Sequence, residues 1–106
     1  MLAASARALA QKGSEIAAFY RAYDDAVNEV NANPETYREA IVSGCDFPPA
    51  VSSLMQIPRF RHAFLPAETQ VNDVSAWMIQ KGLVNRTPLY TDVVAQGYVA
   101  ADARTQ

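Results

Sequence analysis

Apolar residues between Ser14 and Val42 recur at steps of three and four, and this spacing constrains the fold more than any other feature of the chain. Residues with that spacing share one side of an α-helix, so the stretch predicts an amphipathic helix with one buried stripe. The stripe consists of Ile16, Phe19, Tyr20, Tyr23, Ala26, Val27 and Val30. We expect the opposite face to be solvated; it carries Glu15, Arg21, Asp24, Asp25, Asn28 and Glu29.

Capping residues divide the first half of the chain into three predicted helices. Ser5, Ser14 and Asn33 are good N-caps, because their side-chain oxygens can accept a hydrogen bond from the first turn. Gly13 suits the end of a helix, and Pro34 suits the first helical position, where the amide has no partner. We expect helices over residues 6–12, from 14 to about 31, and from 34 to about 44.

Prolines and Gly82 predict where the helices in the second half of the chain begin and end. Pro49 and Pro66 each precede a predicted helix. Gly82 suits a left-handed helix end, from which Leu83 folds back on Met78. We expect helices over 50–55 and 67–81, a helical turn over 91–94 capped by Thr91, and a frayed tail over 98–106.

These elements predict an all-α fold of about five helices in one domain, residues 1–106, because no segment shows the alternation of a strand. In the helix over 67–81 we expect Val71, Val74, Trp77 and Met78 to face inward. Replacing a buried aromatic such as Tyr23 or Trp77 by alanine would then cost about 3–5 kcal/mol.

Composition excludes several classes of protein. The net charge is -2 over 106 residues, and no basic patch is large enough to bind nucleic acid. No apolar run approaches the roughly 20 residues that a membrane-spanning helix needs. Residues 1–4 are too short for the core of a signal peptide, so we expect none in this chain. The single cysteine, Cys45, excludes an internal disulfide, and we expect it to be a small buried apolar residue.

Arg59, Arg61 and His62 form a small basic cluster that suggests a ligand. Such a cluster could hold a carboxylate or a sulfonate, because guanidinium groups donate paired hydrogen bonds to oxyanions. The alternative is an ordinary solvated loop. No second histidine is present, so we expect no metal site.

Catalysis has no support in the sequence. Cys45 and His62 could pair as thiol and base, but nothing supplies an oxyanion hole. Adjacent Asp24 and Asp25 would point roughly 100° apart on a helix, so they cannot act together on one substrate. The four glycines are scattered and form no phosphate-binding loop. We therefore expect no enzyme, no catalytic residue and no cofactor.

Three motifs in order carry a resemblance to a known family. They are F-x-x-A-Y at Phe19–Tyr23, N-x-N-P-E at Asn31–Glu35, and W-h-h-x-K-G-L at Trp77–Leu83, where h is apolar. With this order and spacing, residues 1 to about 94 resemble the C-terminal end of the extracytoplasmic solute-binding proteins of ABC importers. The resemblance is to the nitrate, sulfonate, taurine and thiamine-precursor type.

The resemblance implies the helical end of a two-lobed α/β periplasmic binding protein of type II, with its strands outside this chain. It implies a C-terminal fragment of a periplasmic or extracytoplasmic transport component, whose partners are a small solute and an ABC permease. In that family the solute is gripped mostly by loops of the absent part, so no binding residue carries over.

An alternative class is a self-contained all-α interaction module that dimerises through its apolar stripe. A fragment with an uncovered apolar face would also self-associate. Strands and a secretion signal encoded in frame upstream would favour the transport component.

Overall fold

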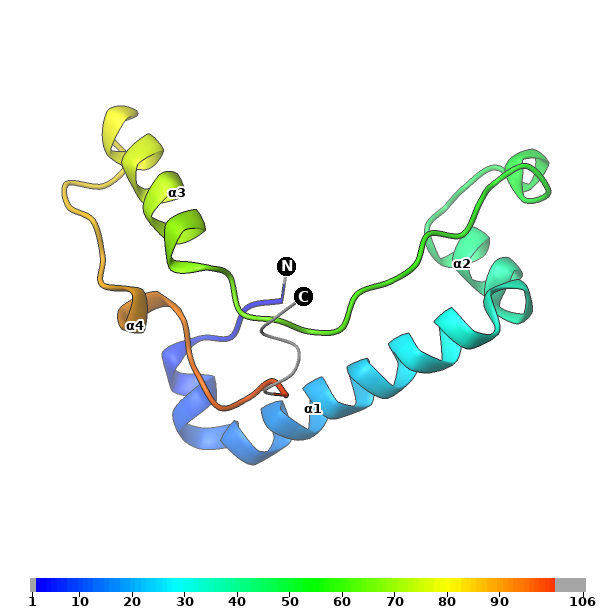
Figure 1. Ribbon diagram of the computed structural model, residues 1–106, viewed down its shortest axis with the longest axis horizontal. Helices are drawn as coiled ribbons and strands as arrows, with labels where there is room; N and C mark the ends of the chain where they lie inside the picture. Colours follow the sequence, from blue (N-terminus) through cyan, green and yellow to red (C-terminus); the bar gives the residue numbers. More distant parts are fainter. Residues whose placement is uncertain (1, 101–106) are drawn as a thin grey trace.

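The computed structural model describes residues 2–100, and every regular element in that range is helical (Figure 1). The all-α prediction is therefore confirmed, with four α-helices and two 3-10 turns in place of about five helices. The elements are α1 (Ala6–Ala32), η1 (Pro34–Tyr37), α2 (Arg38–Gly44), η2 (Pro49–Val51), α3 (Glu68–Gln80) and α4 (Tyr90–Val93). The part of the expected frayed tail over 101–106 lies outside the described residues.

The elements form an open arrangement around α1. In Figure 1, α1 forms the base, α2 and η2 lie at one end, and α3 and α4 lie at the other. The radius of gyration is 17.4 Å, whereas a compact domain of this length has a radius of about 13 Å. The chain exposes 8159 Å², against about 5,800 Å² for a compact monomer of the same mass. About 2,300 Å² of surface that a closed fold would bury is thus exposed.

α1 joins the two helices that the sequence predicts on either side of Gly13. Ser5 caps it as predicted, because its Oγ accepts a hydrogen bond from the Ala8 amide at 3.1 Å. The first helix does not end at Gly13 as predicted. Instead, α1 kinks at Lys12, where φ is -134° and ψ is 32°. Tyr98 lies against this kink, since a Cβ on Gly13 would be 3.4 Å from the Tyr98 hydroxyl.

Ser14 lies inside α1 and does not cap it, so the cap predicted there is wrong. Its hydroxyl donates a hydrogen bond to Glu15 Oε2 at 2.8 Å. This bond lowers the pKa of Glu15 below its usual value of 4.5. The hydroxyl is thus bonded to a neighbouring side chain and not to a backbone amide of the first turn after the kink.

The turn after α1 is placed as predicted, but its side chains are used differently. Asn33 and Pro34 begin η1, and the α-helical geometry starts only at Arg38. The Asn33 side chain does not cap η1; its Nδ2 donates to Glu29 Oε1 at 3.0 Å. The Tyr37 hydroxyl donates to the same oxygen at 3.2 Å. Partial burial, together with this bond to Glu29, raises the pKa of Tyr37 above 10.0.

The end of α3 confirms the predicted left-handed stop. Gly82 has φ of 69°. Its amide donates to the Ile79 carbonyl and the Leu83 amide donates to the Met78 carbonyl, both at 2.9 Å. These are the two bonds of a Schellman ending.

Two short elements differ from the predictions. The helix expected over residues 50–55 is wrong: the structure has the 3-10 turn η2 followed by a turn. The cap expected at Thr91 is wrong, since α4 begins after Leu89 and its first turn is closed by Asp92 Oδ2, which accepts from the Leu89 amide at 3.3 Å.

Burial departs most from the sequence prediction. The best-buried apolar side chains are Val27, Val42 and Val94, exposed by 5%, 7% and 7%. Trp77 and Val74, which were expected to face inward, are exposed by 53% and 58%. Phe19 of the predicted stripe is 54% exposed. The helical period was predicted correctly, but residues 2–100 leave these side chains more than half exposed.

Gly82→Ala should destabilise the chain by about 1 kcal/mol, because a Cβ is disfavoured at the positive φ of this helix end. Gly44→Ala is the matched control: Gly44 ends α2 without a positive φ, and a Cβ there meets nothing within 4 Å. Thermal unfolding followed by circular dichroism should show a lower Tm for Gly82→Ala alone. Equal Tm values for the two variants would contradict the Schellman ending.

Candidate functional site

An extended segment, residues 56–67, runs from η2 to α3 and passes over α1 (Figure 1). We call it the crossing segment. It contains the three candidate residues Arg59, Arg61 and His62. An extended chain outside a sheet must find partners for its peptide groups wherever they are withdrawn from water. Side chains of α1 supply them here.

Asn31 pairs with both peptide groups of Phe60. Its Nδ2 donates to the Phe60 carbonyl and its Oδ1 accepts from the Phe60 amide, each at 2.8 Å. A carboxamide can do this because it carries a donor and an acceptor side by side, as a backbone peptide does. Asn31 thus acts as a short piece of neighbouring strand for the crossing segment.

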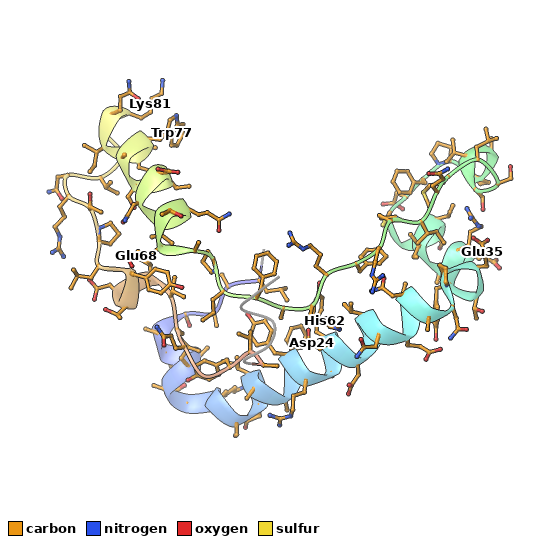
Figure 2. The ribbon with its side chains drawn as sticks, viewed as in Figure 1. Asp24, Glu35, His62, Glu68, Trp77 and Lys81 are labelled. Carbon is orange, nitrogen blue, oxygen red and sulfur yellow. The ribbon has the colours of Figure 1, made fainter. Side chains whose placement is uncertain are left out.

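Three further residues of α1 continue this contact. Asp24 Oδ1 accepts from the Ala63 amide at 2.7 Å, and Asn28 Oδ1 lies 2.7 Å from His62 Nε2. The Tyr23 hydroxyl donates to the Arg61 carbonyl at 3.5 Å. Figure 2 shows His62 and Asp24 together where the segment passes over the helix.

The expectation of a solvated polar face on α1 is therefore wrong for Asp24, which is half-buried and bonded, while Asp25 remains exposed. The spacing of Asp24, Asn28 and Asn31 is four and then three, so they share one face of the helix. That polar spacing was a signal in the sequence. We expected these polar residues to be solvated, because periodicity shows which residues share a face of a helix but not whether another segment packs on that face.

The three candidate residues are brought together at a hollow of about 330 Å³. Its lining is Asn31, Arg59, Phe60, Arg61 and His62. The Arg61 guanidinium carbon lies 5.0 Å from the centre of the Phe64 ring, a distance at which a cation is attracted to an aromatic face. His62 is half-buried, whereas both arginines are exposed. The hollow is lined by positive charge and one aromatic ring.

Arg38 holds together the part of the molecule that contains η1, α2 and η2. The sequence analysis did not identify this role. The Arg38 Nε and one terminal nitrogen donate to the two Glu35 carboxylate oxygens, both at 2.7 Å. Its other terminal nitrogen donates to the carbonyls of Ser52 and Met55. The guanidinium thus ties η1 and α2 to the chain around η2. Its spacing of three from Glu35 was the only signal available.

A second hollow, of about 250 Å³, lies where α4 meets the start of α3. It is lined by Leu65, Pro66, Ala67, Tyr90 and Gln96. The Tyr90 hydroxyl donates to the Pro66 carbonyl at 2.7 Å and fixes α4 there. This hollow carries no charged side chain, so it has no clear chemistry.

Other classes of site find little support among the described residues. Within 2–100, no three histidine, cysteine, aspartate or glutamate side chains are grouped to hold a metal ion. Cys45 is exposed, so the expectation of a buried apolar cysteine is wrong. No helix in the described range is long and apolar enough to cross a membrane.

Comparison of the chain with protein-family models, with curated proteins and with solved structures found no match in any of the three.

Asp24→Ala should lower the free energy of unfolding by about 1–2 kcal/mol, because the Ala63 amide loses its acceptor. Asp25→Ala is the matched control and should change it by less than about 0.5 kcal/mol, as is usual for exposed sites. Urea denaturation of both variants measures the difference. A neutral Asp24→Ala would show that this hydrogen bond does not hold the crossing segment.

Glu35 gives a pH prediction. The hydrogen bond from Arg38 lowers the pKa of Glu35 below 4.5, so the native state favours its ionised form. The resulting stability is present above pH 4.5 and is lost as the pH falls through the lowered pKa. In urea titrations, wild type should lose its advantage over Glu35→Gln as the pH falls below 4.5.

Arg38→Gln supplies the control for this pH effect. In that background the Glu35→Gln substitution should have no pH-dependent effect on stability, because the hydrogen bond is already absent. An unchanged pH dependence in Arg38→Gln would contradict the ion pair as its cause.

Proposed function

We propose that this chain is the helical C-terminal part of a solute-binding component of an ABC uptake transporter. In this proposal the chain is not an enzyme, and its helices support an α/β lobe by covering one face of its sheet. The observation that carries the proposal is the exposed surface, about 2,300 Å² more than a compact monomer of this mass would show.

The exposed apolar side chains support this role because several of them lie on α3. Val74 and Trp77 are three residues apart, so they share a face of the helix, and both are more than half exposed. Figure 2 shows Trp77 near the free end of α3, away from α1. A sheet face covered with apolar side chains would bury Val74 and Trp77, in the way that sheets and helices pack against each other in α/β folds.

The family resemblance adds the biological setting. By that resemblance, the partners are a small solute and a membrane permease, and the location is periplasmic or extracytoplasmic. A solute cleft needs two walls that enclose most of the ligand. The chain alone should therefore contribute support and not the main solute contacts.

A second candidate is a self-contained module that dimerises. The same excess surface favours it, because obligate interfaces bury about 2,000–5,000 Å² in total. This candidate predicts one defined dimer that unfolds cooperatively. The transport proposal predicts instead ill-defined association that a complementary lobe prevents.

The test is to express the chain together with a solute-binding protein of this type, truncated before its last helices. A 1:1 complex should form, and taurine or nitrate should raise its Tm. Trp77→Ala should change the stability of the isolated chain by less than about 1 kcal/mol, since the ring is exposed. It should weaken the complex at least about tenfold, as the loss of a buried aromatic anchor does.

Asn72→Ala, an exposed polar position on the opposite side of the same helix, is the control and should leave the complex unchanged. Light scattering after size exclusion measures the species present. A discrete dimer of the chain that ignores the truncated protein would overturn the transport proposal and support the second candidate.

A further inference from the structure

We propose that α1 is a hinged helix that pivots at Lys12 and Gly13, and that the ring of Tyr98 holds the hinge bent. When Tyr98 leaves Gly13, α1 straightens, and residues 2–11, the N-terminal arm, swing away from the rest of the helix. The hinge lies on a different element from the exposed α3 side chains that carry the proposed function, so each proposal can fail without the other.

A single residue separates the bent helix from a straight one. Lys12 is the residue of α1 at which φ and ψ, -134° and 32°, leave the helical region, and the helix continues on both sides of it. Gly13 and Ser14 follow directly, and kinks in helices commonly occur at such glycine and serine pairs. Figure 1 shows the bend near the start of α1. Hinge motions are absorbed in this way, by a φ/ψ change at a few residues.

The local sequence permits the straight form as well. Residues 6–20 contain no proline, and alanine, the best helix former, recurs through them. Gly13 has no Cβ, so it can adopt helical angles or leave them at little steric cost. The bend must therefore be maintained by contacts from other parts of the chain.

Tyr98 makes such a contact at the bend itself. A Cβ on Gly13 would lie 3.4 Å from the Tyr98 hydroxyl oxygen and 3.6 Å from its Cε1, so the side chain covers the glycine. Tyr98 is half-buried, so the tail that was expected to fray from residue 98 is packed at its start. We call residues 94–98 the C-terminal strap. Val94, at its other end, is 7% exposed and anchors it.

A second contact depends on the bend. The Tyr20 hydroxyl donates to the Leu2 carbonyl at 3.5 Å, although the two residues lie on opposite sides of the hinge. In a straight helix, Ser5 and Tyr20 would be about 22 Å apart along the axis. The stretch from Leu2 to Ser5 spans at most about 10 Å, and a tyrosine side chain is too short to bridge the remainder. The straight form therefore loses this hydrogen bond.

The two forms differ in the surface that they present. In the bent form, Leu2 lies beside Tyr20, whose ring meets the Phe19 ring edge-on at 5.8 Å. In the straight form, this pair of rings loses Leu2 as a neighbour, and the strap loses its seat on Gly13. A partner that binds either surface only when α1 is straight would shift the population toward that form by its difference in affinity.

The experiment is NMR of the full chain labelled with ¹³C and ¹⁵N, because Cα and carbonyl shifts report φ and ψ at each residue. In wild type, Lys12 should have non-helical shifts between two helical stretches. In Tyr98→Ala, the Lys12 shifts should move to helical values, and the NOE between the Tyr20 ring and Leu2 should be lost. Tyr98→Phe is the matched control and should keep both wild-type signals, because its ring carbons still cover Gly13.

Gly97→Ala displaces the same ring by another route. Gly97 precedes Tyr98 with φ of 91°, a conformation that a residue with a Cβ rarely adopts. This variant should also move Lys12 to helical shifts, while residues 20–32 stay helical. If Tyr98→Ala unfolds, Gly97→Ala decides the question.

Three results would overturn the proposal. Lys12 shifts that stay non-helical in a folded Tyr98→Ala or Gly97→Ala chain would show that the bend belongs to Lys12 and Gly13 alone. Helical Lys12 shifts in wild type or in Tyr98→Phe would show that the ring does not hold a bend. Loss of the helical shifts over residues 20–32 in both Tyr98→Ala and Gly97→Ala would show that the strap holds the whole fold and not the hinge.

Discussion

Hydrogen bonds from the side chains of α1 to the backbone of the crossing segment hold this molecule together. The part with α2 and η2 and the part with α3 and α4 lie apart, at the two ends of α1 (Figure 1). The segment between them would have no fixed path without Asn31 and Asp24, which accept from its amides. A helix thus takes the part that a neighbouring strand plays in a sheet. These bonds fix the chain on both sides of Arg61.

The sequence was informative about local structure because local structure depends on nearby residues. Ser5 as a cap, the turn at Asn33 and the left-handed end at Gly82 each follow from the conformational preferences of one or two side chains, and the structure confirms them. The cluster Arg59, Arg61 and His62 was also visible, and the structure places it around one hollow.

The remaining features depend on contacts between distant parts of the chain. Periodicity identified the apolar side of α3, but whether Trp77 is buried depends on what packs there, and it is 53% exposed. Asp24 was expected in water because its partner, the Ala63 amide, is 39 residues away. Arg38 was missed for the same reason, since its carbonyl partners come from residues 52 and 55. The open shape follows from these same long-range contacts, which are too few to close a core.

The single tryptophan and the single cysteine provide a donor and an attachment site for measuring a distance by energy transfer. Trp77 lies near the tip of α3, and the exposed Cys45 lies just after α2, at the other end of α1. A thiol-reactive acceptor dye on Cys45 would take up energy emitted by the indole with an efficiency that falls as the two arms separate. Any event that swings α3 toward α2, or pushes it away, would be read as a colour change without adding a second label.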